Sequence, residues 1–133
     1  MKSYERKATK EAPPSAPPSA LTDHWVEGIE NHLVDVLDGK GPGGAHHEYA
    51  IRCGTETQAI RFQRGGVAEA GINGILIEDL LAIVKHRLEC FQAGPFPCAE
   101  NDHALTHVVS ALEQLKHRTR QRIERGVEGR EKE

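Results

Sequence analysis

The sequence predicts an α+β protein in which a short antiparallel β-hairpin is followed by a long antiparallel α-helical hairpin. Apolar residues alternate with polar ones across residues 46–64, which is the period of a strand. Across residues 76–126 they recur every three or four positions, which is the period of a helix. With 133 residues, 38% of them hydrophobic and 28% charged, the chain has room for one modest core. We therefore expect a single domain over residues 22–133.

The first elements are a tail and a short helix. Residues 1–21 are rich in proline, alanine and serine and cannot bury enough apolar surface to offset the entropy of ordering, so we expect a flexible tail. After it, apolar residues at helical spacing predict a helix over residues 22–39: Trp25, Ile29, Leu33, Val36 and Leu37. The β-branched residues of "HLVDVLDG" would also suit a strand, and that alternative stays open.

The β-hairpin follows a glycine-rich loop. "HHEYAIRC" and "QAIRFQRG" each alternate between apolar and polar residues, and "GTET" between them reads as a turn. The next stretch, "RGGVAEAGINGI", contains four glycines, which predicts positive φ angles or close approach of another group. A two-stranded ribbon is marginally stable alone, so its apolar face must be covered by the helices or by another copy of the chain.

Two amphipathic helices complete the chain. The first begins near Ile77 and ends before Gly94, and the second runs to Gly126. Their apolar stripes are Leu80, Leu81, Val84, Leu88 and Phe91 in the first, and Leu105, Val108, Val109, Leu112, Leu115, Thr119 and Ile123 in the second. The link "GPFPCAEN" is so short that the helices must run antiparallel. Such a small assembly exposes much apolar surface, which favours self-association.

Charge is distributed unevenly along the chain. Residues 22–102 carry 13 acidic and 6 basic residues, whereas residues 103–133 carry 5 acidic and 7 basic ones. The basic residues gather at the end of the second helix: Lys116, Arg118, Arg120, Arg122 and Arg125. Cations in this place also favour the helix dipole, so a solvated helix end is the simplest explanation. A basic patch this local suits a small anion better than long nucleic acid, which needs a wide positive footprint.

Sites for metals or catalysis are weakly supported. His86 with Cys90 and His103 with His107 have helical i, i+4 spacing, and Cys98 lies between the pairs, but the short Cys-x2-Cys knuckle of structural zinc sites is missing. "GKGPGG" lacks the order of a phosphate-binding loop, and no cysteine lies in a nucleophile motif. We expect no catalytic residue, no metal and no cofactor, and three free thiols.

Further features of the sequence concern the cellular location of the protein and the ligands it could contact. It has no apolar run long enough for a membrane span and no secretory signal, so we expect a cytoplasmic protein with no membrane partner. His46 and His47 end the glycine-rich loop and could reach a ligand, although an exposed strand start is the more ordinary reading. An aromatic residue next to an amide, as in Phe91 and Gln92, is suited to reading a nucleobase, while periodicity alone favours core packing for Phe91.

Residues 46–129 resemble a known family. The motifs are "HHEYAIR", "IRFQRGGVAEAGINGI", "EDLLAIVKHRLECFQAGPF", "EN" followed by "AL", and "HRTRQRIERGVEG". In order and spacing they are similar to the phage-encoded family that shares the helical hairpin of Thoeris anti-defence protein one and anti-CBASS protein two. The β-hairpin before the helices makes the Thoeris anti-defence branch the closer match. One departure is "RGGVAEAGING", where the family favours a proline after the glycine.

The resemblance implies an anti-defence protein that acts in the cytoplasm of the infected bacterial host. Such proteins bind cyclic ADP-ribose isomers, such as glycocyclic ADP-ribose, and in related members cyclic di- and trinucleotides. They hold these immune signals without cleaving them, which blocks Thoeris and, for related members, CBASS immunity. The single domain expected over residues 22–133 is, with this resemblance, a ligand-binding domain. The resemblance also implies assembly as a homo-oligomer, with a hexamer as the expected form.

The resemblance also implies ligand-binding residues. Phe91 matches the aromatic that stacks on adenine, Asn101 a polar contact, and Arg118 the arginine that meets the pyrophosphate. Gln92 and Arg122 are further candidates beside them, and Arg125 is a candidate for a second pocket for trinucleotides. Asn101 and Arg118 are 17 residues apart on one helix, a separation of about 25 Å. If both touch one ligand, they must come from different protomers.

Two readings from other classes stay open beside this one. The arginine-rich helix could serve a small nucleic-acid-binding accessory protein. Alternatively, Cys90, Cys98, His103 and His107 could form a metal-dependent enzyme or a structural zinc site.

Overall fold

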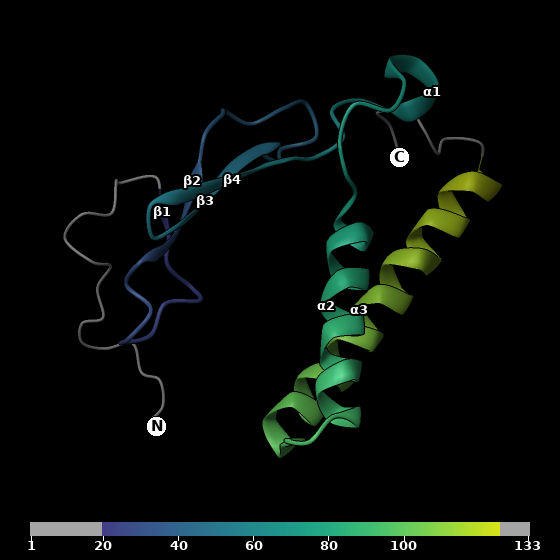
Figure 1. Ribbon diagram of the computed structural model, residues 1–133. Helices are drawn as coiled ribbons and strands as arrows, with labels where there is room; N and C mark the ends of the chain where they lie inside the picture. Colours follow the sequence, from purple (N-terminus) through teal and green to yellow (C-terminus); the bar gives the residue numbers. More distant parts are fainter. Residues whose placement is uncertain (1–19, 126–133) are drawn as a thin grey trace. The chain divides into compact units, whose positions relative to one another are not determined.

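The computed structural model describes residues 20–125, and the chain divides into two compact units at the boundary between Arg61 and Phe62 (Figure 1). The first unit carries a sheet and the second carries the helices, so the α+β class is confirmed. The expected single domain over residues 22–133 thus spans both units. Most of the tail expected over residues 1–21 lies outside the described residues. Its last two residues form strand β1 (Ala20–Leu21), so for them the expectation was wrong.

The sheet has four antiparallel strands in chain order. Strand β1 pairs with β2 (His32–Val36), which pairs with β3 (Glu48–Cys53), and β3 forms a hairpin with β4 (Glu56–Arg61). Gly54 has a φ of 63° in the two-residue turn that joins β3 to β4. Such turns need positive φ and match the twist of the strands, which is why glycine stands there. The hairpin lies within the predicted residues 46–64 and is confirmed.

The helix predicted over residues 22–39 was wrong. Its first part is a series of turns, and Gly28, with a φ of 102°, lies in a conformation that no helix contains. Its second part is strand β2, in which Val34 and Val36 pair with Ile51 and Tyr49 of β3. The β-branched valines favour the extended backbone, and a neighbouring strand satisfies their peptide groups. The apolar residues at helical spacing therefore lie in turns and in a strand, and they do not form one helical face.

One face of the sheet holds its two buried apolar residues and an ion pair. Leu33 and Ala50 are buried on one face. The side chain of Arg52 lies on the same face and donates from Nε to Oδ2 of Asp35 at 3.0 Å and from Nη2 to Oδ1 at 3.3 Å. A forked arginine and carboxylate pair of this kind fixes both side chains more strongly than a single contact would.

The second unit begins with a closed loop. Phe62 and Ile75 form a parallel bridge, and the chain between them contains the single-turn helix α1 (Val67–Ala70), which the sequence did not predict. Gly65 and Gly71 have φ angles of 78° and 74°. At Gly74, a Cβ atom would lie 2.5 Å from the carbonyl carbon of Phe62. Both explanations offered for the four-glycine stretch, positive φ and close approach, are therefore confirmed.

Helix α2 (Ile77–Ala93) and helix α3 (Ala99–Glu124) form the predicted hairpin and lie side by side (Figure 1). The carboxylate of Asp79 accepts a hydrogen bond from the N–H of Leu76 and caps α2. Near the C-terminal end of α3, the hydroxyl of Thr119 donates to Oε2 of Glu78 at 3.4 Å. This hydrogen bond connects the end of α3 to the start of α2. The antiparallel arrangement expected over residues 76–126 is confirmed for its described part. No helix among residues 20–125 is long and apolar enough to cross a membrane.

Candidate functional site

The tip of the helical hairpin presents an exposed aromatic ring. Phe91 lies in the last turns of α2 and is 50% exposed, although its position continues the apolar stripe of the helix. Val84, one heptad earlier, is 41% exposed. The core packing that periodicity favoured for Phe91 was therefore wrong within the described residues. The residues of the apolar stripe that pack against α3 lie to one side of Phe91 on the surface of α2. The ring therefore remains available for stacking.

Gln92 holds the tip together. Its amide nitrogen donates to the carbonyl of Cys98 at 3.1 Å, and its amide oxygen accepts from the N–H of Cys98 at 3.1 Å. The thiol of Cys98 in turn accepts the N–H of Asn101 at 3.4 Å. This chain of contacts joins the end of α2 to the start of α3 and brings Asn101, which is half-buried, to the same end of the hairpin as Phe91. Of the sequence-predicted site residues, the tip therefore gathers three.

The remaining predicted residues lie near the other end of α3 and differ in surroundings. Arg118 is exposed, and no partner for it occurs among residues 20–125. Arg122 is only 8% exposed and already engages a partner, and Arg125 is exposed but also engaged. Lys116 pairs with Glu113 at 3.2 Å. The arginine run is thus not one uniform solvated face.

The two groups of predicted residues are separated along α3. Asn101 stands in its first turn and Arg118 near its last turns, and the helix is continuous between them. At 1.5 Å per residue, their Cα atoms are about 25 Å apart. One chain therefore does not bring Asn101 and Arg118 to one small ligand.

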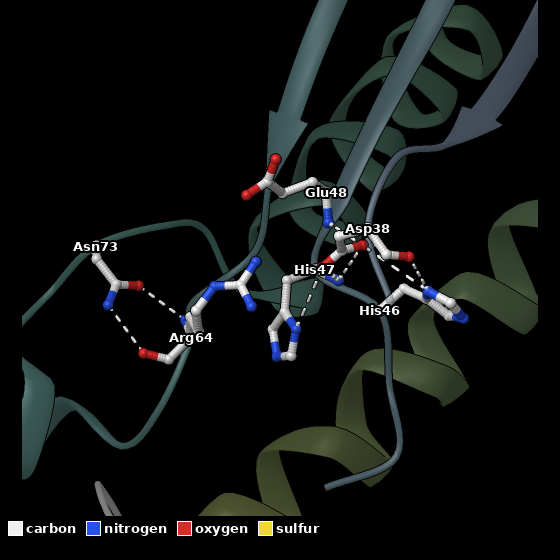
Figure 2. Close-up of polar contacts among 6 residues, drawn as sticks. All are labelled: Asp38, His46, His47, Glu48, Arg64 and Asn73. Carbon is white, nitrogen blue, oxygen red and sulfur yellow. Dashed lines mark hydrogen bonds and ion pairs between the residues drawn. The ribbon is translucent and has the colours of Figure 1, made fainter. Parts of the chain in front are cut away.

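The first unit contains a carboxylate that sequence reasoning missed. Asp38 accepts hydrogen bonds from the backbone N–H groups of His47 and Glu48 at 3.0 to 3.1 Å (Figure 2). Its own carbonyl accepts from Nδ1 of His46 at 2.6 Å. Nδ1 of His47 lies 3.8 Å from Oδ2 of Asp38, which is too long for a hydrogen bond. These contacts close the glycine-rich loop between β2 and β3. In the sequence, the aspartate directly before the glycine-rich loop was the feature from which this loop closure could have been predicted.

The loop of the second unit is closed by two amides. The side chain of Asn73 accepts from the N–H of Arg64 at 2.7 Å and donates to its carbonyl at 2.8 Å (Figure 2). Gln63 accepts from the N–H of Asn73 and donates to the carbonyls of Gly65 and Gly71. Gln63 follows Phe62 as Gln92 follows Phe91, and its side-chain amide is occupied by contacts within its own loop.

The metal ligands considered from the sequence do not come together. Among residues 20–125, no group of three or more histidine, cysteine, aspartate and glutamate side chains is placed to hold a metal ion. Sγ of Cys90 lies 3.7 Å from Nε2 of His86, which makes a pair and no more. All three cysteines are free thiols, as expected.

Comparisons with known proteins place this geometry in a family. The family model described as Acb2/Tad1, hairpin domain, matches residues 54–120, which include β4, the closed loop, α2 and most of α3. The protein named Thoeris anti-defense 1 from Bacillus phage SBSphiJ7 is 41% identical over 98 residues, which cover 73% of this chain and 69% of that protein. The helical hairpin of the structure agrees with the family model and with the relative. The chain therefore belongs to the Acb2/Tad1 hairpin domain family.

Proposed function

We propose that this protein is a phage anti-defence protein that binds cyclic nucleotide immune signals and holds them away from their effectors without cleaving them. Its ligands are cyclic ADP-ribose isomers, such as glycocyclic ADP-ribose, and cyclic di- and trinucleotides are further candidates. It acts in the cytoplasm of the infected bacterial host and blocks Thoeris immunity, and with the other ligands CBASS immunity. A relative that is 41% identical carries the name Thoeris anti-defense 1 and supports the biological role.

One observation carries the proposal at the site. An exposed aromatic ring at the tip of the hairpin and an exposed arginine near its far end both remain available for a ligand. A purine can stack on Phe91, and the planar guanidinium of Arg118 can meet phosphate oxygens with two hydrogen bonds. These contacts recognise a nucleotide and require no catalytic group.

The proposal places each pocket between two protomers. About 25 Å of helix separates Asn101 from Arg118, so a ligand that touches both must receive them from different chains. Exposed apolar residues on the helical hairpin support self-association as a homo-oligomer, with a hexamer as the expected assembly: Ile77, Ile83, Val84, Phe96, Val109 and Ile123. Association covers these residues and builds the pocket in the same step.

The distribution of the basic residues weighs against long nucleic acid. Arg122 is buried and engaged, and Lys116 is paired with an acid, so the run does not offer a continuous set of free cations. Affinity for duplex DNA or RNA grows with the number of phosphates neutralised. A few placed guanidiniums suit one small anion better.

Ligand release tests the proposal directly. Purified protein is incubated with cyclic ADP-ribose isomers, cyclic dinucleotides or cyclic trinucleotides, washed, and denatured by heat, and the supernatant is examined by mass spectrometry. We expect at least one cyclic nucleotide to return intact and in near-stoichiometric amount. Hydrolysed product would indicate an enzyme, and no retained nucleotide from any class would refute the proposal.

A further inference from the structure

Arg87 lies beside the exposed ring at the tip of the hairpin. It is one helical turn before Phe91 on α2, and its Cζ atom is 5.4 Å from the centroid of the ring. Arg87 is itself exposed, and the ring is half exposed. A guanidinium at this distance is attracted to the electron-rich face of an aromatic ring. The contact favours an arrangement in which the guanidinium lies over the ring before any ligand arrives.

The charge of Arg87 is not compensated by a nearby acid. The closest acidic residue along the helix, Glu89, pairs with Lys85 at 2.7 Å. Within the described part of the chain, no carboxylate forms an ion pair with Arg87. By contrast, Arg52 of the sheet is forked onto Asp35. Arg87 thus combines a restraining contact with the ring and a positive charge that is available to a ligand.

This combination suits a nucleotide phosphate. A base that stacks on Phe91 carries its phosphate beyond one ribose, and a side chain as long as that of an arginine one turn away can reach across that span. The guanidinium can donate two parallel hydrogen bonds to phosphate oxygens. Because the ring already restrains the side chain, less conformational entropy is lost when those hydrogen bonds form.

We propose that Arg87 is a ligand-binding residue that contacts a phosphate of the nucleotide whose base stacks on Phe91. The inference rests on the proposed function and adds a second anion contact to the same pocket. Arg118 of one protomer and Arg87 of the protomer that supplies the ring then hold the pyrophosphate from two sides. The pocket accordingly selects nucleotides whose stacked base adjoins a phosphate over uncharged nucleosides.

Titration calorimetry of four variants tests this assignment, with the cyclic nucleotide that the wild type binds as probe. Arg87→Ala and Arg87→Gln should each weaken binding by about 10- to 100-fold, because a hydrogen-bonded charge is lost. Both should also make affinity less dependent on salt. Arg87→Lys keeps the charge but not the fork and should recover part of the loss. Lys85→Ala removes one cation from the same helix away from the ring and should change affinity by less than about threefold.

The outcomes separate this inference from the proposed function. If the wild type binds and Arg87→Gln binds as tightly with unchanged salt dependence, Arg87 only supports the ring and the inference is wrong. Equal losses for Arg87→Lys and Arg87→Ala would likewise refute a role for its charge. If the wild type binds no cyclic nucleotide, the proposed function fails and this inference falls with it. Circular dichroism of each variant checks that the helices are intact.

Discussion

Arg118 and Arg120 are two residues apart on α3, and both are exposed, yet we predict different roles for them. Arg118→Ala should weaken binding of a cyclic ADP-ribose isomer by about 2–5 kcal/mol, because a desolvated pyrophosphate loses its partner. Arg120→Ala should cost less than about 1 kcal/mol, as expected for a solvated cation. Titration calorimetry on both variants measures the difference. Equal and small effects would mean that the arginine run is only a solvated helix end.

Asp38 has a structural role that a second residue-scale experiment can measure. Asp38→Ala removes the acceptor of two backbone N–H groups, those of His47 and Glu48. Leaving such donors without a partner should lower the free energy of unfolding by about 1–3 kcal/mol. Urea denaturation provides the value, and Asp23→Ala, at an exposed position, serves as control with a change within about 0.5 kcal/mol. A change in Asp38→Ala no larger than that in the control would show that the closed loop adds no stability.

At the scale of elements, the sequence predicted those whose pattern is long and whose stop signals are strong. The helical hairpin combines many apolar positions with the break at Gly94 and Pro95, and the β-hairpin has a two-residue turn that needs glycine. Residues 22–39 lack such redundancy. There, pairing of β2 with β3 decided the structure, and a pairing partner 13 to 21 residues away cannot be seen in the local spacing of apolar residues.

The candidate site was predictable in part for the same reason. The family motifs indicated Phe91, Asn101 and Arg118, and their placement on α2 and α3 followed from helical period. The period could not tell which half of a wide stripe would face the other helix. It therefore put Ile123 on the face of α3 that packs against α2, whereas Ile123 is 60% exposed and its neighbour Arg122 is buried. Gln92, with both ends of its amide bound to Cys98, shows that an amide beside an aromatic ring can support a turn as well as read a base.

The loop between β4 and α2 depends on Gly74, which gives a prediction at this scale. In Gly74→Ala, the new Cβ would lie 2.5 Å from the backbone of Phe62, so the bridge from Phe62 to Ile75 must shift. We expect a loss of about 2 kcal/mol or more in stability, since backbone cannot move aside as a side chain end can. Thermal unfolding followed by circular dichroism tests it. Gly43→Ala, whose Cβ would meet nothing within 4 Å, is the matched control and should be near neutral.

At the scale of the whole molecule, the amount of exposed apolar surface predicts assembly. Among the described residues, only two apolar side chains, Leu33 and Ala50, are buried, while Phe96 is 85% exposed and Ile83 58%. A chain with so small a core gains most of its remaining apolar burial from other copies. We expect light scattering at micromolar concentration to return an oligomer larger than a dimer. A stable monomer would remove the physical basis for pockets shared between chains.

If each pocket is shared between two chains, Asn101 and Arg118 of one pocket come from different protomers. Mixing two variants tests this. Asn101→Ala and Arg118→Ala should each abolish tight binding without dissociating the oligomer, since neither residue belongs to the exposed apolar set. When the two variants are unfolded together and refolded as a mixture, a pocket formed by an intact Asn101 from one chain and an intact Arg118 from another is wild type. Random mixing should restore roughly a quarter of the pockets, because each of the two contributions is intact half of the time. Calorimetry of the mixture should then reveal a tight class of sites that neither variant has alone. If binding does not return although mixed oligomers form, both residues act within one chain, and the pocket cannot include the two ends of α3.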